Sequence, residues 1–112
     1  RKSDMVISGG VNIYPAEVEA VLLELPGVKD AAVFGVPDPE FGERVVAVVE
    51  PDGPRTSPDA LLEGLQQRLA RYKLPREIHM QATLPREDSG KIKKRLLRQR
   101  WMASTDNGEH SR

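Results

Sequence analysis

The sequence predicts an α+β domain in which a small three-stranded sheet is flanked by helices and preceded by an N-terminal β-hairpin. Two nearly continuous apolar, β-branched runs at residues 28–36 and 43–50 are typical of strands that are covered on both faces. Residues 77–84 alternate apolar and polar side chains, as a half-buried strand does. Helical patterns separate and follow these strands, so helices and sheet are expected to pack as layers.

The N-terminal hairpin is predicted from a Gly9-Gly10 pair between two β-prone triplets. A helix is expected to follow, because Pro15 suits a first helical position, where its missing N–H costs nothing. Pro26-Gly27 ends this helix. Its buried stripe follows the i, i+3, i+4, i+7 pattern through Val18, Val21, Leu22 and Leu25.

Two further helices are predicted. Ser57 can cap the first of them, with Pro58 in its first turn, and Lys73-Leu74-Pro75 ends it. The last helix spans residues 92 to about 101, and residues 103–112 lack an apolar period and are expected to form a disordered tail. The buried stripe of the Ser57-capped helix comprises Leu62, Leu65 and Leu69, extended by Tyr72.

Composition narrows the functional classes. The 112 residues contain no cysteine, which excludes disulfides and thiolate metal sites and is compatible with a cytoplasmic setting. Lys plus Arg and Asp plus Glu both number 17, so bulk charge gives no reason to expect a nucleic-acid or membrane partner. No apolar stretch approaches the roughly 20 residues that span a bilayer. Because the chain starts at Arg1 without a methionine, we expect it to be part of a longer protein.

Two stretches are more polar and richer in glycine than folding requires. Residues 1–19 match the pattern Arg-x-x-Asp-x-aliphatic-x-x-x-Gly followed by Pro-x-Glu-aliphatic-Glu, and residues 84–91 match Leu-Pro-x-x-x-x-Gly-Lys. In this order and at this spacing they resemble two signature motifs of the adenylate-forming superfamily, which includes acyl-CoA synthetases, peptide-synthetase adenylation domains and luciferases. The resemblance covers nearly the whole chain up to the tail. It implies that residues 1–102 form a C-terminal lid domain, with residues 1–4 as the interdomain hinge.

The resemblance implies an ATP-dependent acyl-CoA synthetase. Such an enzyme joins a carboxylic acid to ATP, releases pyrophosphate, and transfers the acyl group from the acyl-adenylate to coenzyme A, with AMP as the second product. Residues 11–17 look like fatty-acyl and aryl-CoA ligases, so fatty-acid metabolism is the favoured setting. The partner would be the enzyme's own large N-terminal domain, which would bind Mg²⁺, most of ATP and the acyl chain. This fragment alone is expected to be inactive.

Lys91 is the residue with the clearest implied role. It matches the lysine that contacts both the substrate carboxylate and the α-phosphate during adenylation. An ammonium between these two anions relieves their repulsion and stabilises the charge that builds on the phosphoryl oxygens. Gly90 gives the backbone freedom to present the lysine at the tip of a loop. Arg1 matches a linker arginine that contacts the nucleotide.

The N-terminal motif implies a hinge and a second functional loop. Ser3 lies at the hinge position, which is usually aspartate or lysine in the family, and the adjacent Asp4 is the alternative pivot. The small domain is implied to rotate about this hinge between the two half-reactions. A glycine loop is implied to turn toward the active site in the second half-reaction, where it helps to form the pantetheine tunnel for coenzyme A. This loop comprises Ser8, Gly9, Gly10 and Val11.

Two alternatives stay open at the level of sequence. One is an adenylation domain that loads a carrier protein, although such domains usually carry arginine and glutamate within residues 11–17. The other is a basic nucleic-acid-binding module, because residues 91–100 hold six basic side chains. No aromatic residues are interleaved there for base stacking, so a solvated or cofactor-facing helix is favoured. His79 has no second ligand at metal-binding spacing, and no metal site is predicted.

Overall fold

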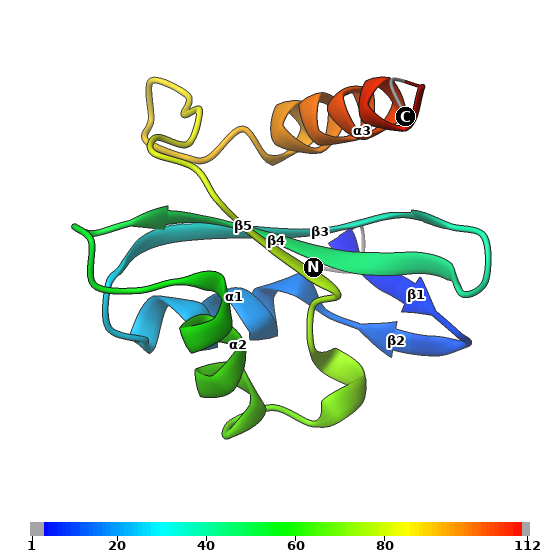
Figure 1. The fold of residues 1–112 in the computed structure, drawn as a ribbon, viewed down its shortest axis with the longest axis horizontal. Helices are drawn as coiled ribbons and strands as arrows, with labels where there is room; N and C mark the ends of the chain where they lie inside the picture. The colour runs from blue at the N-terminus through cyan, green and yellow to red at the C-terminus, as the bar shows by residue number, and fades with distance from the viewer. Residues whose placement is uncertain (1–3, 111–112) are drawn as a thin grey trace.

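The computed structural model describes residues 4–110, with side chains as far as Ser104. In this part of the chain, a two-stranded sheet, a three-stranded sheet and three α-helices confirm the predicted α+β arrangement (Figure 1). None of the described helices is long and apolar enough to cross a membrane. The elements in chain order are β1 (Val6–Ser8), β2 (Val11–Ile13), α1 (Pro15–Glu24), β3 (Val28–Asp38), β4 (Gly42–Pro51), α2 (Pro58–Gln66), the 3₁₀ helix η2 (Arg71–Lys73), β5 (Glu77–Met80) and α3 (Lys94–His110).

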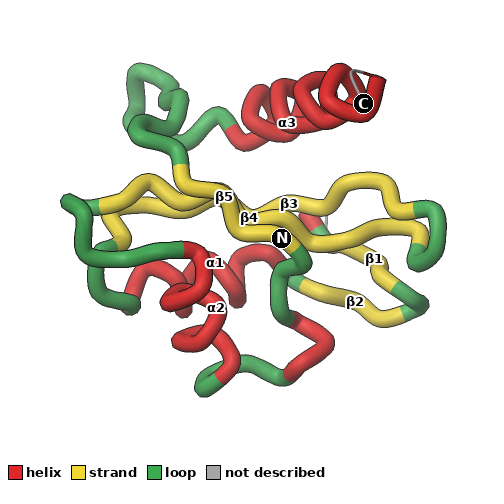
Figure 2. Tube along the Cα trace, in the orientation of Figure 1, coloured by secondary structure: helices red, strands yellow, loops and turns green. Residues whose placement is uncertain are grey.

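The larger sheet is built on a long hairpin. β3 pairs antiparallel with β4, from Asp30 opposite Glu50 near the open end to Asp38 opposite Gly42 beside the connecting turn. β5 extends the sheet to the order β3-β4-β5 and runs parallel to β4. Figure 2 shows the layers: α1, α2 and the β1–β2 hairpin lie on one face of this sheet, and α3 lies on the other. The described chain therefore covers both faces of a single sheet.

Each face of the sheet carries its own hydrophobic core. Alternate residues of β4 divide between them: Val45, Ala47 and Val49 pack with α1 and α2, whereas Val46 and Val48 pack under α3. Because both sets are buried, the sequence of β4 is a continuous apolar run rather than an alternation of apolar and polar residues. The core under α3 is the smaller of the two and consists of Ala32, Phe34, Val36, Val46, Val48, Leu84 and Leu97, with Ile92, Trp101 and Met102 packed at its edge.

The predicted ends of several elements are confirmed. Pro15 is the first residue of α1 and is buried. Ser57 caps α2, where its hydroxyl oxygen accepts a hydrogen bond from the Ala60 amide at 3.2 Å. Gly9 and Gly10 form the turn between β1 and β2 with φ values of 57° and 82°, which glycine adopts without the penalty of a Cβ. Local sequence chemistry thus decides where the chain turns.

The third strand of the large sheet is shorter than the sequence predicts. β5 ends at Met80, and the chain then crosses the edge of the sheet from one face to the other. Ile78 and Met80 pack against the larger core, whereas Leu84 is buried in the smaller one. Ala82, predicted to point inward, is exposed. The alternating pattern arises because buried residues of two different cores follow one another, not because the strand is continuous.

Two helices differ from their predicted extents. α3 begins at Lys94 and continues to His110, so it includes most of the segment predicted as a tail; residues 111–112 lie outside the described residues. Helix propagation adds one hydrogen bond per residue once a nucleus exists, and no proline interrupts this stretch. α2 ends at Gln66, and its buried residues are Leu61 and Leu65. Tyr72, predicted for the same stripe, lies beyond the helix in η2 and is 53% exposed.

Candidate functional site

A short loop between β5 and α3 carries Lys91. The Glu87 amide donates a hydrogen bond to the Lys91 carbonyl at 2.8 Å, and the Gly90 amide donates to the Glu87 carbonyl at 2.8 Å. These two bonds close a three-residue hairpin turn in which Gly90, with a φ of 93°, takes the left-handed position. No atom lies within 4 Å of the place that a Gly90 Cβ would occupy, so the glycine is needed for its backbone conformation rather than for space.

The side chain of Lys91 is exposed to solvent. It lines an open hollow of about 1290 Å³ together with Asp4, Arg86 and Lys94. Both of these basic neighbours are engaged in ion pairs, but Lys91 has no ion-pair partner among residues 4–104. An ammonium that is neither neutralised nor buried can approach a carboxylate or a phosphate. The predicted role of Lys91, contact with the substrate carboxylate and the α-phosphate, requires an ammonium that is free in this way.

Arg86 ties the turn that carries Lys91, residues 87–91 and called the lysine loop below, to the large sheet. Its guanidinium lies 2.7 Å from Asp30 Oδ2 on β3 and 3.2 Å from Glu50 Oε1 on β4. It also donates a hydrogen bond to the Gly90 carbonyl at 3.2 Å. The hydrogen bond with Asp30 is the main cause that raises the pKa of Arg86 above its usual value. The loop that presents Lys91 therefore starts from a fixed point on two adjacent strands.

Glu50 is buried, with 5% of its surface exposed, and its carboxylate is well satisfied. Oε1 accepts a hydrogen bond from the Leu84 amide at 3.1 Å in addition to the bond from Arg86, and Oε2 lies 3.5 Å from Lys29 Nζ. The Leu84 amide and then Arg86 hold the pKa of the Glu50 carboxyl below its usual range, against the opposing effect of burial. Sequence reasoning missed Glu50 and Arg86; the available signal was a carboxylate at the end of an apolar strand.

The first residue of α3 binds the first residue that the structure describes. Lys94 Nζ lies 2.7 Å from Asp4 Oδ2 and 2.7 Å from Glu19 Oε2. Glu19 also accepts a backbone hydrogen bond from β3. Asp4, the alternative hinge of the sequence analysis, is thus tied directly to α3 and, through Lys94, to α1. Ser3, predicted as the hinge, and Arg1, predicted to contact the nucleotide, lie outside the described residues.

The predicted glycine loop, residues 8–11, is held near the turn between β3 and β4. The Gly9 amide donates a hydrogen bond to the Phe41 carbonyl at 2.9 Å. Asp38 positions Phe41, because its Oδ1 accepts a hydrogen bond from the Phe41 amide at 2.8 Å. This hydrogen bond is the main cause that lowers the pKa of Asp38. A Cβ on Gly9 would lie 3.3 Å from the Phe41 ring, whereas no atom lies within 4 Å of the corresponding place on Gly10. Gly10 therefore leaves open space at the tip of the hairpin.

The lysine loop and the glycine loop lie at opposite ends of the large sheet (Figure 1). The first is bonded to Asp30 and Glu50 at the open end of the β3–β4 hairpin, and the second to Phe41 at its closed end. From Asp30 to Asp38, at roughly 3.3 Å per residue, the separation along β3 is about 26 Å. The loops also lie on opposite faces, because β1 and β2 contribute to the larger core and Leu84 to the smaller. The structure therefore does not place the lysine loop and the glycine loop in one site.

Part of the basic run at residues 91–100 is used inside the domain. Lys94 forms the ion pairs described above, and Arg98 Nε donates a hydrogen bond to the Gly35 carbonyl at 2.6 Å. These contacts hold α3 on the sheet. They leave fewer cations for an outward-facing basic surface than the sequence alone indicates.

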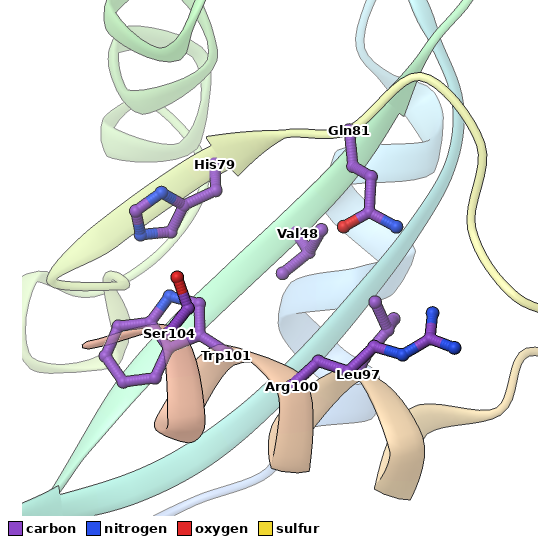
Figure 3. A pocket seen from close by; sticks show the side chains of 7 residues that line it. All are labelled: Val48, His79, Gln81, Leu97, Arg100, Trp101 and Ser104. Carbon is purple, nitrogen blue, oxygen red and sulfur yellow. The ribbon is translucent and has the colours of Figure 1, made fainter. Parts of the chain in front are cut away.

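A smaller hollow of about 260 Å³ lies between β5 and α3 and is lined by His79 (Figure 3). His79 Nε2 lies 3.0 Å from Glu77 Oε1, and the imidazole meets the ring of Trp101 edge-on at 5.9 Å. Across the described residues, no group of three or more His, Cys, Asp or Glu side chains is arranged to hold a metal ion. The contacts of His79 serve the packing of the edge strand against α3.

The chain matches the model of a known protein family. The family model described as the AMP-binding enzyme C-terminal domain matches residues 17–91, a segment that runs from α1 to Lys91 itself. The chain belongs to this family. The adenylate-forming resemblance inferred from the two motifs is thereby confirmed. The AMP-binding C-terminal domain described here includes both the lysine loop and the strands that hold it.

Relatives of this AMP-binding C-terminal domain are named as CoA ligases or synthases. The long-chain-fatty-acid–CoA ligase FadD13 of Mycobacterium tuberculosis is 44% identical over 104 residues, which cover 93% of this chain and 21% of that protein. The feruloyl-CoA synthase of an Amycolatopsis species is 53% identical over 102 residues, covering 90% and 21%. The solved structure of a Mycobacterium tuberculosis fatty acyl CoA synthetase matches with a TM-score of 0.88 and 44% identity, covering 93% and 21%. The chain thus spans about 21% of the length of these relatives.

Proposed function

We propose that this chain is the mobile C-terminal domain of an ATP-dependent acyl-CoA ligase, which activates a carboxylic acid as its acyl-adenylate and then transfers the acyl group to coenzyme A. The observation that carries the proposal is the placement of Lys91 and of Gly9-Gly10 at opposite ends of one sheet. Two loops so far apart do not serve one reaction centre at the same time. They serve it in turn if the whole domain rotates between the two half-reactions.

Lys91 acts in the first half-reaction. A carboxylate oxygen attacks the α-phosphorus of ATP, a new O–P bond forms, and the bond to the pyrophosphate leaving group breaks. The exposed ammonium of Lys91, set between the two anions, offsets their repulsion and stabilises the negative charge that grows on the phosphoryl oxygens. We assign the ligands of the ATP-associated Mg²⁺ to the N-terminal domain on the resemblance to adenylate-forming enzymes.

The glycine loop acts in the second half-reaction. The thiol of coenzyme A releases its proton to solvent as its sulfur attacks the acyl carbonyl. A C–S bond forms, and AMP leaves with the electron pair of the C–O bond. The thiol ends a thin pantetheine arm that needs a narrow, open passage, and the absence of a side chain at Gly10 suits this need. Ile7 and Val11 beside the turn expose 47% and 40% of their surfaces, which offers apolar contact to the arm.

The pivot of the rotation is assigned to Ser3. The ion pair with Lys94 holds Asp4 to the body of the domain, which supports the view that Asp4 moves with it. Ser3 is the next residue toward the N-terminal domain and matches the hinge position of the family. Arg1, on the other side of Ser3, is assigned to contact the nucleotide on the same resemblance. The hinge motion then needs large φ and ψ changes at few residues only.

A fatty or aryl acid is the proposed substrate, with coenzyme A rather than a carrier protein as the acceptor. The names of the two relatives point to a long-chain fatty acid and to ferulate, and this chain is 44% and 53% identical to them. One type of small domain thus accompanies very different acyl groups. We therefore assign acyl selection, and with it the choice between fatty-acid and aryl-acid metabolism, to the N-terminal domain.

The test measures both half-reactions in the full-length enzyme. Lys91→Ala should lower pyrophosphate exchange by about 10²–10³-fold, the loss typical of removing one group that stabilises developing charge. Thioester formation from supplied acyl-AMP should be largely spared. Lys93→Ala, an exposed lysine two positions away, is the matched control. Equal loss in both half-reactions, or an equal effect of Lys93→Ala, would contradict the role of Lys91. A panel of acids, tested with coenzyme A and with a phosphopantetheinylated carrier protein, identifies substrate and acceptor.

A further inference from the structure

The turn that presents Lys91 closes mainly on itself. Residues 87–91 are exposed, and the hydrogen bonds from Glu87 to Lys91 and from Gly90 to Glu87 both lie within the turn. These bonds fix the shape of the turn but not its orientation relative to the sheet. Its direction depends on contacts at the neck, where Arg86 pairs with Ile92 in an isolated β-bridge. The contacts of Arg86 and Ile92 at the base of the turn therefore set the direction of Lys91.

The guanidinium of Arg86 connects groups that lie far apart in the sequence. Nη1 lies 2.7 Å from Asp30 Oδ2 and donates to the Gly90 carbonyl at 3.2 Å, while Nη2 lies 3.2 Å from Glu50 Oε1. Asp30 and Glu50 face each other as pairing partners across β3 and β4. The Gly90 carbonyl belongs to the peptide bond that leads directly into Lys91. One planar group therefore spans from the paired strands to the peptide next to the lysine.

We propose that Arg86 is a positioning residue for Lys91, which orients the lysine loop for adenylation. This inference rests on the proposed function of Lys91. A guanidinium holds several N–H donors in one rigid plane, so it can bond two carboxylates and a carbonyl together, whereas the compact ammonium of a lysine cannot reproduce that fork. Glu50 is a firm support, because it is buried and is also bonded to the Leu84 amide.

Loss of this support should affect one half-reaction only. A misplacement on the order of 1 Å of a group that acts on the reacting atoms can cost about 10²-fold in rate. Arg86 does not contact the glycine loop, which is bonded to Phe41 at the other end of the sheet. The transfer to coenzyme A should therefore be spared. Because most of ATP is held by the N-terminal domain in the proposed enzyme, kcat of adenylation should fall while KM for ATP stays nearly constant.

The experiment compares Arg86→Met, Arg86→Lys and Asp30→Ala in the full-length enzyme, with Arg68→Met as the matched control. Arg68 forms an exposed ion pair with Glu24 at 3.2 Å, away from the lysine loop. Both Arg86 variants should lower kcat of adenylation by about 10–100-fold. KM for ATP and thioester formation from supplied acyl-AMP should stay within about twofold. Asp30→Ala should act in the same direction, and combining it with Arg86→Met should add little, because Arg86→Met already removes the contact with Asp30.

Three results would overturn the proposal. The first is an equal loss in both half-reactions that follows a loss of thermal stability. The second is wild-type kcat for Arg86→Lys. The third, decisive if the Arg86 variants do not fold, is undiminished adenylation by Asp30→Ala, although this variant loses the shortest contact of the Arg86 guanidinium. Lys91→Ala distinguishes failure of the proposed function of Lys91 from failure of the positioning role of Arg86. If it retains adenylation, the proposed function fails; if it loses adenylation while Arg86→Met and Asp30→Ala keep it, only the positioning role fails.

Discussion

The ammonium of Lys94 lies 2.7 Å from a carboxylate oxygen of Asp4, which stands 90 residues earlier in the chain. The Lys94 side chain is 24% exposed, so water screens this pair only in part. The contact fastens the point where the chain enters the domain to the first residue of α3. A rotation of the domain about its linker that keeps this ion pair must turn about bonds that precede the Cα atom of Asp4.

Ser3→Pro in the full-length enzyme should hold the domain in one arrangement, most simply the adenylating one. Proline fixes φ near −65° and restricts the preceding residue, Lys2. Acyl-AMP should still form, while its conversion to the thioester slows by orders of magnitude. Single-turnover measurement of each half-reaction checks this. Asp4→Pro should instead harm both half-reactions, because it removes the partner of Lys94. A normal thioester rate in Ser3→Pro rules out Ser3 as the hinge, and selective damage by Asp4→Pro moves the pivot to Asp4.

Gly10→Leu should impair transfer to coenzyme A while adenylation survives. Two effects must be separated, because Gly10 has a φ of 82° as well as open space around it. Gly10→Ala imposes the conformational penalty of a side chain at positive φ, about 1–2 kcal/mol, with little added bulk. Comparing the two variants in the second half-reaction isolates the effect of size. If alanine slows transfer as much as leucine does, backbone conformation rather than passage width explains the glycine.

Glu50→Gln should destabilise the 112-residue chain at neutral pH. Folding lowers the pKa of Glu50 from its ordinary 4.5, so the stability that its charge contributes is present above 4.5 and is lost as the pH falls through the folded value. We expect a loss of about 1–3 kcal/mol at neutral pH. Thermal unfolding of both proteins across the acid range should show the difference shrinking as the pH falls. A difference independent of pH would mean that the charge itself contributes nothing.

Leu97→Ala should loosen α3 from the sheet without disturbing α1. Leu97 is 3% exposed and is a member of the smaller core, whereas α1 packs in the larger one. Truncation of a buried leucine to alanine costs about 2–5 kcal/mol. Hydrogen exchange should accelerate in α3 amides and stay nearly unchanged in α1. Equal acceleration in both helices would show that the two cores unfold as one cooperative unit.

The features that sequence reasoning predicted well are those with a short-range signal. The apolar runs of β3 and β4, the cap at Ser57 and the turn at Gly9-Gly10 each depend on neighbouring residues, and the structure confirms all of them. The motif at residues 84–91 is likewise a pattern of neighbouring residues. By contrast, the strand predicted through Leu84 was too long, because one-dimensional alternation does not distinguish burial in one core from burial in two.

The contacts that hold the candidate site were not predictable in this way. Asp30, Glu50 and Arg86 stand in three different elements and look like ordinary charged residues. They meet only because β3 and β4 pair in one particular register and the chain crosses the sheet edge before Leu84. The same holds for Asp4 and Lys94. Long-range pairing of charges needs the tertiary fold before it can be recognised.

Trp101 is the only tryptophan in the sequence, and its position makes it an optical probe of one boundary in the molecule. Its ring lies 5.4 Å from the Arg44 guanidinium and 5.9 Å from the His79 ring, between α3 and the sheet (Figure 3). Indole emission depends on exposure to water, so the tryptophan fluorescence of this chain reports the undocking of α3 from the sheet. Far-ultraviolet circular dichroism reports the helices and strands together. Recorded side by side, the two signals distinguish release of one helix from loss of the whole fold.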